Sequence, residues 1–331
     1  MPESSVLPMT NIEIPPVLYL VVPCYNEEEV LPETSHLLKK KMDSLISSGS
    51  ISPNSRILLA NDGSADTTWQ IICSLHADEG NGGLFTGISL AHNRGHQNVL
   101  FAGLMTALER GCDIAISLDA DLQDDINAID EMIDAHHKGA NIVYGVRNNR
   151  DTDSKFKRET AQVFYKLMSS MGTETIPNSA DYRLMDRQAL IALSQYEEVN
   201  LFLRGIVPSL GFKTAKVYYK RGERLAGESK YPLSKMLSLA IDGVTSFSVA
   251  PLRAVTAVGV AFVFIALVVL IYALASLISG KAVSGWTSLL ISIWFVGGCL
   301  MLSLGVVGEY IGRIYTESKH RPRYFISEEL S

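Results

Sequence analysis

Two apolar runs near the C-terminus constrain this chain more than any other feature. From Val255 to Val307 the only charged side chain is that of Lys281. Val255–Ile278 and Trp286–Val307 are each long enough to cross about 30 Å of hydrocarbon as an α-helix. A buried core helix could explain one such run, but two runs joined by a short linker at Gly280-Lys281 predict a transmembrane hairpin.

The basic residues around these runs predict the orientation of the hairpin. Basic side chains near the ends of a span are retained on the cytoplasmic side. The linker holds only Lys281, whereas several basic residues flank the hairpin on the outside: Lys230, Lys235, Arg253, Arg313, Lys319, Arg321 and Arg323. Residues 1–16 lack the basic start and apolar stretch of a secretory signal. Both termini are therefore expected in the cytoplasm, with Lys281 on the opposite side.

The segment before the first run has helical periodicity. Between Pro232 and Ser248, apolar residues recur at positions that share one helix face. This pattern predicts a helix lying along the membrane surface. An ordinary amphipathic helix packed on a globular domain fits the same pattern.

Charge and cysteine content exclude some classes of protein. The formal net charge of −6 at pH 7 argues against a nucleic-acid binder, which needs a basic surface. The four cysteines, Cys24, Cys73, Cys112 and Cys299, lie far apart without the spacing of metal ligands. They are expected to be reduced structural thiols.

The residues before the membrane segment alternate between short apolar runs and helical patterns. Strands are expected at 17–22, 56–60, 87–90, 114–118 and 142–146, and helices at 28–47, 67–77, 97–109, 126–138 and 155–171. Such alternation predicts an α/β domain with a mostly parallel sheet covered on both faces. Ligands of such sheets bind at the carboxyl ends of the strands.

Polar loops follow four of these strands. Tyr25-Asn26-Glu27 follows the first, Asn61-Asp62-Gly63-Ser64 the second, His92-Asn93-Arg94-Gly95 the third and Asp119-Ala120-Asp121 the fourth. Asp119 and Asp121 can present two carboxylates together, which suits Mg²⁺ or Mn²⁺ bridging a diphosphate. An acidic turn exposed to solvent is the alternative. The chain has no Gly-x-Gly-x-x-Gly after the first strand and no P-loop motif.

Taken together, these motifs carry a family resemblance. Pro23-Cys24-Tyr25-Asn26-Glu27, the Asn-Asp-Gly-Ser turn and Asp119-Ala120-Asp121-Leu122-Gln123-Asp124 resemble the inverting family-two glycosyltransferases with the GT-A (Rossmann-like) fold. The downstream runs 179–186, 202–205 and 227–231, together with two terminal spans, resemble bacterial polyprenyl-phosphate sugar transferases, especially bactoprenol glucosyltransferases. The resemblance covers nearly the whole chain after Val17.

The resemblance implies a donor site and a metal site. It assigns the nucleotide-sugar to Pro23, Tyr25, Glu27, Asp62, Asp119, Ala120 and Arg147, and Mg²⁺ or Mn²⁺ to Asp119, Asp121 and Gln123. UDP-glucose is the favoured donor, while UDP-galactose, UDP-N-acetylhexosamine and GDP-mannose stay open. The segment His92–Gln97 departs from the family's commoner Arg-Asn-Phe-Gly form, so neither His92 nor His96 is assigned a role.

The resemblance also implies an acceptor site for polyprenyl (undecaprenyl) phosphate. The expected phosphate ligands are Arg204, Arg221, Arg224, Ser229 and Lys230. Guanidinium groups suit phosphate recognition, although general attraction to anionic headgroups would also place basic residues here. Asp181 occupies the position of the family's catalytic base. Because a phosphate monoester is already largely ionised at neutral pH, Asp181 could instead orient the acceptor or balance the arginines.

The expected organisation follows from these assignments. We expect an N-terminal extension (1–16), a GT-A domain (17–231), a membrane-surface segment (232–254), two transmembrane helices (255–310) and a cytoplasmic tail (311–331), in the plasma membrane. Glycines at 297, 298, 305 and 308 favour helix packing and a homo-oligomer. A processive polysaccharide synthase is disfavoured because the chain lacks Gln-x-x-Arg-Trp and further spans. A non-catalytic lipid-binding scaffold is the alternative from another class.

Overall fold

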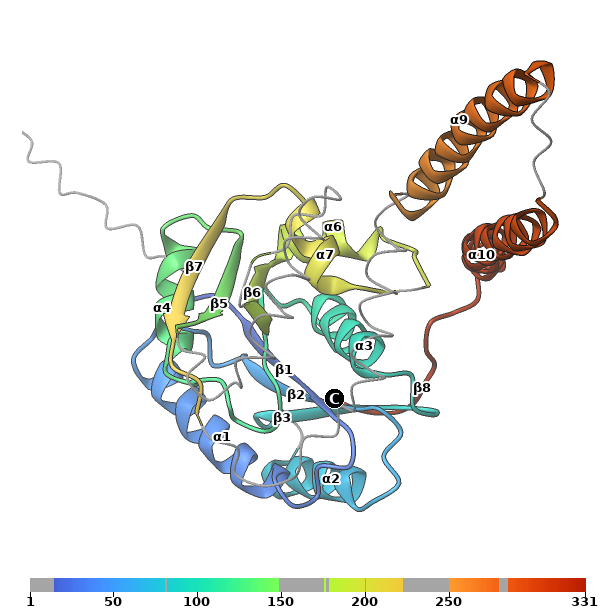
Figure 1. Cartoon of the computed structure of the whole chain (residues 1–331). Helices are drawn as coiled ribbons and strands as arrows, with labels where there is room; N and C mark the ends of the chain where they lie inside the picture. Colours follow the sequence, from blue (N-terminus) through green and yellow to red (C-terminus); the bar gives the residue numbers. More distant parts are fainter. Residues whose placement is uncertain are drawn as a thin grey trace, which may run out of the picture.

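The computed structural model describes residues 15–80, 82–148, 176, 179–199, 201–222, 250–279 and 285–331. Within these residues a single sheet is covered by short helices, and two long helices project away from it (Figure 1). The helices expected at 155–171 and 232–248 lie outside the described residues.

The first part of the sheet domain follows the expected alternation of strands and helices. Its elements are β1 (Leu18–Cys24), α1 (Leu31–Ser47), β2 (Arg56–Asn61), α2 (Thr68–Glu79), β3 (Phe85–Leu90), α3 (His96–Glu109), β4 (Ile114–Ser117), α4 (Ala128–His137) and β5 (Ile142–Arg147). All five predicted strands and the four predicted helices in this region are confirmed, with ends shifted by a few residues.

The later elements are β6 (Ser179–Asp186), α6 (Arg187–Ser194), α7 (Leu203–Ser209), β7 (Thr214–Tyr219), α9 (Ala250–Ile278), α10 (Trp286–Glu317) and β8 (Ile326–Leu330). Of the later elements, only the two long helices α9 and α10 were predicted. The later strands carry polar residues at many positions, which hides the apolar alternation that identifies a strand.

The strands are arranged in the order β7-β5-β6-β4-β1-β2-β3-β8. β1 pairs in parallel with β2 and β4, β2 with β3, and β5 with β7. β6 lies antiparallel between β4 and β5, and β8 pairs antiparallel with β3. The predicted mostly parallel sheet is therefore confirmed, with two strands that run the other way.

Alternate residues of β1 point into two separate apolar cores. Leu18, Leu20 and Val22 pack on one face with residues of α1, α2 and α4. Tyr19 and Val21 pack on the other face with residues of α3, α6 and α7. Because both faces of β1 are buried, its sequence is almost wholly apolar, as expected for a central parallel strand.

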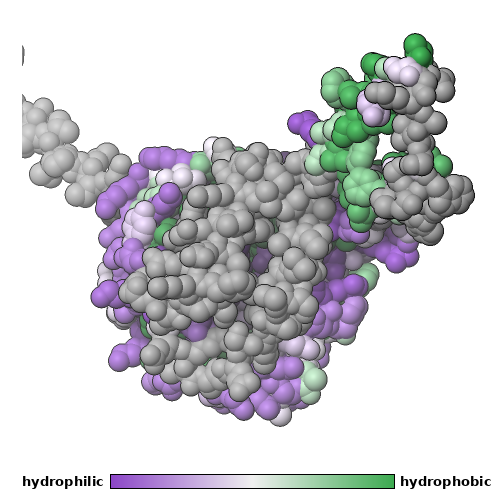
Figure 2. Space-filling view, in the orientation of Figure 1, coloured by the Kyte–Doolittle hydropathy of each residue, from purple (hydrophilic) through white to green (hydrophobic). Residues whose placement is uncertain are grey.

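The long helices α9 and α10 match the two predicted spans and extend beyond them. Both contain a window apolar enough to cross a membrane, at Leu252–Val269 and Phe295–Glu317. Most of their described apolar side chains are exposed, and Figure 2 shows these side chains as a green surface set apart from the purple surface of the sheet domain. Length and composition thus agree with the two predicted spans, while their arrangement as a membrane hairpin remains a prediction.

The residues after α10 do not form a separate tail. The chain returns to the sheet, where β8 pairs with β3 between Gly87–Leu90 and Ile326–Leu330. Ser327 donates a hydrogen bond to the backbone oxygen of Ser89 (3.0 Å), and Arg110 contacts Glu329 (2.7 Å). The segment expected to be a tail at 311–331 therefore contributes an edge strand to the sheet domain.

Candidate active site

Charged and polar side chains gather at the end of the sheet where β1, β2 and β4 finish. β6 is antiparallel to β4, and Ser117 at the end of β4 lies opposite Arg183 of β6. The start of β6 is thereby placed beside the loop that follows β4. This topology brings Asp181 next to Asp119, although 61 residues of other structure separate them in the order of the chain.

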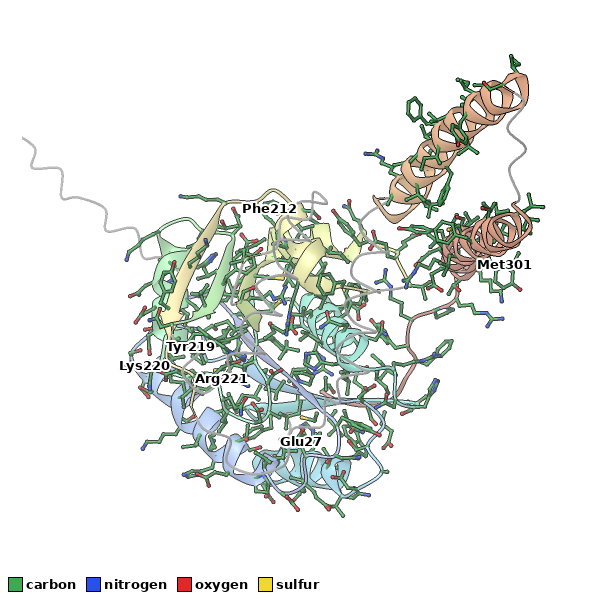
Figure 3. The ribbon with its side chains drawn as sticks, in the orientation of Figure 1. Glu27, Phe212, Tyr219, Lys220, Arg221 and Met301 are labelled. Atoms are coloured by element: carbon green, nitrogen blue, oxygen red, sulfur yellow. The ribbon has the colours of Figure 1, made fainter. Side chains whose placement is uncertain are left out.

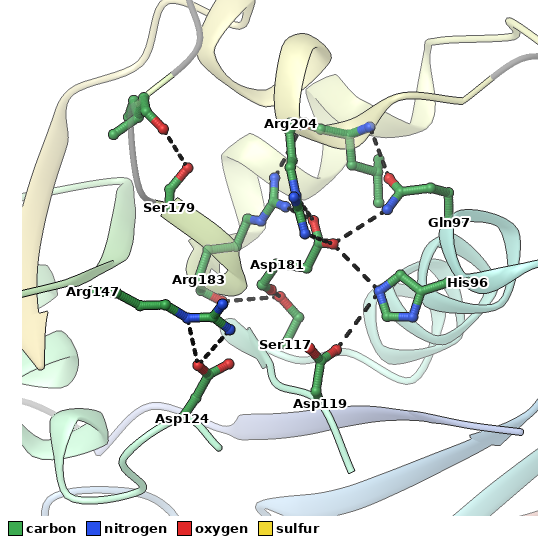
Figure 4. A network of polar contacts seen from close by, with 12 residues as sticks. His96, Gln97, Ser117, Asp119, Asp124, Arg147, Ser179, Asp181, Arg183 and Arg204 are labelled. Carbon is green, nitrogen blue, oxygen red and sulfur yellow. Dashed lines mark hydrogen bonds and ion pairs between the residues drawn. The ribbon is translucent and has the colours of Figure 1, made fainter. Parts of the chain in front are cut away.

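Asp181 is the centre of a dense polar network (Figure 4). Its side chain is 4% exposed, and it is paired with the guanidinium groups of both Arg183 and Arg204. Arg204 Nη2 lies 3.0 Å from Oδ2 of Asp181, and Gln97 Nε2 donates to the same oxygen over 3.3 Å. Ser117 also donates to the backbone oxygen of Asp181. Both carboxylate oxygens of Asp181 are thus engaged.

The charges around Asp181 keep it ionised. Burial alone raises the pKa of a carboxyl group, but the Arg204 guanidinium, the hydrogen bond from His96 and the Arg183 guanidinium outweigh burial. The pKa of Asp181 is consequently held well below its usual range. A carboxylate with such a low pKa is a poor proton acceptor near neutral pH.

His96 lies between the two aspartates. Its Nε2 is 3.4 Å from Oδ2 of Asp181 and 3.7 Å from Oδ1 of Asp119. Burial lowers the pKa of His96, but the hydrogen bond to Asp181 and the charge of Asp119 raise it by more, so that the net shift is upward. His96 was left without a role in the sequence analysis, and the structure puts it in the centre of the site.

Gln97 joins Asp181 to the helix that carries Arg204. Its amide nitrogen donates to Asp181, and its Oε1 accepts a hydrogen bond from the backbone nitrogen of Leu203 over 3.0 Å. Leu203 is the first residue of α7, directly before Arg204. No sequence pattern predicts this contact, because it joins residues far apart in the chain.

Asp119 has the electrostatics of a cation-binding carboxylate. It is half-buried, with a side chain 37% exposed. Its pKa is raised, first by desolvation and then by the negative charges of Asp181, Asp124 and Asp121, against which His96 acts in the opposite direction. Negative charge gathered around Asp119 in this way favours the binding of a cation beside it.

These residues fit a hard divalent metal ion. Asp124 Oδ2 is buried and accepts no hydrogen bond within the described part of the chain. A buried carboxylate oxygen in this state can bind a cation or accept a hydrogen bond from a ligand hydroxyl group. No group of three or more His, Cys, Asp or Glu side chains in the described ranges is arranged to hold an ion alone. Mg²⁺ commonly binds one or two carboxylates and completes its shell with substrate phosphates, so Asp119 and Asp121 suit that mode.

Asp124 organises a second group of side chains beside the first. Its Oδ1 accepts hydrogen bonds from Arg147 Nη2 (2.9 Å) and from the Tyr219 hydroxyl (2.5 Å). Burial and the nearby Asp124 carboxylate raise the pKa of Tyr219, so the hydroxyl stays protonated and donates. Arg147, predicted to contact the donor, is thereby held at the edge of the site by Asp124.

Gln123 is hydrogen-bonded to Arg221. Its side-chain oxygen accepts a hydrogen bond from Arg221, and its backbone oxygen accepts one from the Gly222 nitrogen over 2.8 Å. Arg221 follows the end of β7, close to Tyr219 (Figure 3). The positive charge of Arg221 beside this oxygen disfavours a metal ion there, and the predicted metal role of Gln123 remains a prediction.

Asp62 holds a loop together. The residue is 1% exposed, and its two carboxylate oxygens accept the backbone N–H groups of Arg94 (2.7 Å) and Gly95 (2.8 Å). Burial raises its pKa and the two backbone hydrogen bonds lower it, with a net upward shift. Asp62 thus fixes the loop immediately before His96, while its predicted contact with a nucleotide remains a prediction.

The loop after β1 supplies the remaining donor-site candidates. Tyr25 is 43% exposed and therefore accessible to a ligand. The Glu27 backbone is fixed by a hydrogen bond from its nitrogen to Thr68 Oγ1 (2.9 Å), and Asn26 adopts a left-handed conformation with φ 52°. Pro23 is the penultimate residue of β1, and the Ala120 carbonyl accepts a hydrogen bond from Thr34 (2.7 Å).

The five predicted acceptor residues divide into three sets. Arg204 contacts Asp181, whereas Arg221 contacts Gln123. The other three, Arg224, Ser229 and Lys230, lie outside the described residues. The basic residues are therefore not one cluster in the described structure, because Arg204 and Arg221 lie on different elements and pair with different side chains.

Comparisons with known proteins show which proteins this chain resembles. Residues 19–194 match the family model of glycosyl transferase family 2. The chain is 50% identical over 317 residues to an uncharacterized glycosyltransferase, YkoT, of Bacillus subtilis, covering 95% of this chain and 92% of that protein. It is 40% identical over 316 residues to the bactoprenol glucosyl transferase of Shigella phage SfV, covering 94% of this chain and 98% of the relative.

Among solved structures, glucosyl-3-phosphoglycerate synthase from Mycobacterium tuberculosis aligns with a TM-score of 0.44 and 15% identity, covering 70% of this chain and 78% of that one. This likeness is too remote to carry functional detail.

Proposed function

The chain belongs to glycosyl transferase family 2, and from this premise we propose that it transfers glucose from UDP-glucose to a polyprenyl phosphate with inversion. The chain is a glycosyltransferase with the GT-A fold followed by two apolar helices. The relative from phage SfV is named a bactoprenol glucosyl transferase, and the alignment covers nearly all of both chains. That near-complete coverage supports the same acceptor class and the same sugar for this protein.

The observation that carries the proposal is the pairing of Asp181 with Arg204 beside Asp119. Arg204, whose guanidinium is suited to phosphate, pairs with Asp181, and His96 lies between Asp181 and Asp119, a carboxylate suited to a metal–diphosphate. A sugar transferred from a nucleotide diphosphate to a lipid phosphate needs both environments side by side. His96 contacts the aspartate of each environment and so joins them.

On the donor side, Asp119 and Asp121 would hold Mg²⁺ or Mn²⁺, which supplies positive charge to the departing diphosphate. Arg147 is oriented by Asp124 and Tyr219 toward the same side of the site. The exposed Tyr25 ring is suited to contact the nucleotide. Asp62 acts through the 91–95 loop by fixing its backbone.

On the acceptor side, the phosphate oxygen attacks the anomeric carbon of the sugar. This oxygen needs no base at neutral pH, since the second pKa of a phosphate monoester is about 6. Asp181, whose own pKa is well below its usual range, balances Arg183 and positions Arg204. We therefore propose a positioning role for Asp181, with Arg204 shared between Asp181 and the incoming phosphate.

We further propose that the sheet domain and both termini lie on the cytoplasmic side of the plasma membrane. β8 pairs with β3, so the residues after α10 and the sheet domain must lie on the same side. The chain between them then crosses the membrane an even number of times. The two apolar helices α9 and α10 satisfy this requirement as a hairpin.

A comparison of donors tests the proposed sugar. The purified full chain in vesicles containing undecaprenyl phosphate and Mn²⁺ is supplied in turn with UDP-glucose, UDP-galactose, UDP-N-acetylglucosamine and GDP-mannose. We expect UDP-glucose to give the highest kcat/KM. A higher kcat/KM with another donor would replace glucose in the proposal and leave the acceptor class intact.

A further inference from the structure

The end of α10 and the segment after it contact α3 and the 196–199 loop that precedes α7, and α3 and α7 both carry side chains that contact Asp181. We name Glu317–Leu330 the C-terminal brace. From its contacts we propose that this brace positions the acceptor side of the active site relative to α10, and that Glu317 and Arg323 are positioning residues for transfer to a membrane-embedded acceptor. The proposal rests on the proposed function, since it concerns where a lipid phosphate meets Arg204 and Asp181.

The first contact lies at the end of α10. The Glu317 carboxylate accepts the backbone N–H of Val199 through both oxygens, at 3.0 Å and 2.9 Å. Val199 lies shortly before α7, whose residues Leu203 and Arg204 contact Gln97 and Asp181. The last residue of the apolar helix is therefore bonded to the loop that leads into the arginine-bearing helix of the site.

The second contact is made by Arg323. Its guanidinium donates to the backbone oxygen of Tyr196 and lies 4.6 Å from the centre of the Phe101 ring. Tyr324 adds an edge-on contact to the same ring, with 6.5 Å between ring centres. Phe101 follows Gln97 by one turn of α3, so Arg323 joins α3 to the 196–199 loop.

The third contact lies at the far end of α3. Arg110 follows the last residue of that helix and binds both Glu329 (2.7 Å) and the Leu330 backbone oxygen (3.0 Å). Together with the pairing of β8 and β3, this contact anchors the end of the brace to the sheet. α3 is consequently held at Phe101 and at Arg110 by the same segment that begins at the end of α10.

These contacts connect α10 to the two helices, α3 and α7, that carry the side chains around Asp181. α3 contributes His96 and Gln97 to Asp181, and α7 contributes Arg204. A lipid phosphate reaches the site only at the depth that the membrane surface sets. Since a misplacement of about 1 Å can cost roughly 100-fold in rate, a fixed link between α10, α3 and α7 keeps Arg204 at the depth where such a phosphate lies.

Two acceptors separate this positioning role from a general role in folding. The full chain is reconstituted in vesicles of phosphatidylethanolamine and phosphatidylglycerol, with UDP-glucose as donor. One acceptor is undecaprenyl phosphate in the bilayer, and the other is a short-chain polyprenyl phosphate soluble in water. Wild type is compared with Arg323→Ala and Glu317→Gln. Arg321→Ala is the matched control, because Arg321 is exposed and its side chain forms no hydrogen bond or ion pair with the described residues.

We expect Arg323→Ala and Glu317→Gln to raise the apparent KM for undecaprenyl phosphate about tenfold and to leave the KM for UDP-glucose within about twofold of wild type. Transfer to the soluble acceptor should change much less, and Arg321→Ala should match wild type.

Equal losses with both acceptors, accompanied by a lower melting temperature, would show a merely structural role and overturn the inference. Unchanged kinetics in both variants would also overturn it. If wild type transfers sugar to neither acceptor, the proposed function is wrong, and the inference, which depends on it, is wrong as well.

Discussion

Arg204 Nη2 lies 3.0 Å from Oδ2 of Asp181, so a half-exposed guanidinium and a buried carboxylate neutralise each other. In the proposed mechanism the acceptor phosphate shares the Arg204 guanidinium with Asp181. The buried Arg183 would then keep Asp181 paired while Arg204 binds the phosphate. The proposed role of Asp181 therefore requires its negative charge and no proton transfer.

The first prediction separates the two roles considered for Asp181. Asp181→Asn should lower kcat about 100-fold, because Arg204 and Arg183 lose their counter-ion. The ratio of mutant to wild-type rate should be constant from about pH 5.5 to 8.5, a range that brackets the acceptor pKa of about 6. Asp181 has a lowered pKa and is ionised throughout this range. A relative activity that climbs toward wild type with rising pH would restore the general-base role.

The second prediction is that ionised Asp119 lowers the stability of the folded protein. Its pKa is raised in the folded protein, so the unfolded chain ionises first as the pH rises, and ionisation then disfavours the folded state. Asp119→Asn should therefore raise the melting temperature slightly at pH 7, by a few degrees at most because the side chain is partly screened by solvent. The gain should vanish below about pH 3.9, where the carboxyl group is protonated in both states.

The same variant tests the metal site without an activity assay. Mn²⁺ should raise the melting temperature of wild type by mass action and have little effect on Asp119→Asn. Asp78→Asn serves as the control, because Asp78 is exposed on α2. Equal stabilisation of Asp119→Asn and wild type by Mn²⁺ would place the metal elsewhere.

The third prediction compares His92, in the loop before α3, with His96, the first residue of α3. His96→Ala should lower kcat at least tenfold, because its ring contacts both Asp119 and Asp181. His92 is exposed four residues earlier, and its side chain forms no hydrogen bond or ion pair within the described ranges, so His92→Ala should stay within about twofold of wild type. Similar losses in the two variants would mean that the loop as a whole, and not the ring of His96, matters.

The fourth prediction concerns the membrane hairpin. Gly280→Cys and Ser331→Cys are made separately in a chain whose Cys73 and Cys299 are replaced by Ser, and intact cells are treated with a membrane-impermeant maleimide. The cysteine at 280 should react from outside, and the cysteine at 331 only after the cells are opened. Reaction of both from the same side would exclude a hairpin.

The sequence predicted the early strands because β1, β2 and β4 are buried on both faces and read as continuous apolar runs. It did not predict β6, which carries Asp181, Arg183 and Asp186 and lacks a continuous apolar run. Asp181 and Arg183 are tolerated inside the protein because they pair with each other and because Asp181 also pairs with Arg204.

The same limit applies to the site itself. Asp119 and Asp181 were identified from their motifs, whereas His96, Gln97 and Tyr219 were not assigned to the site. Their importance comes from pairings that only the fold creates, namely His96 between two aspartates, Gln97 against Leu203, and Tyr219 on Asp124. The strand β8 was missed for the same reason, since its charged sequence becomes a strand only by pairing with β3.

The most direct test of the account is whether sugar reaches the lipid. Purified full chain in vesicles is given UDP-glucose labelled in the sugar, with Mn²⁺, in the presence or absence of undecaprenyl phosphate. The account predicts that label enters an organic-soluble product only when undecaprenyl phosphate is present, that UDP is released in equal amount, and that the product carries glucose in the β configuration, inverted from the donor. Label that stays in water while UDP is released at the same rate without the lipid would contradict it.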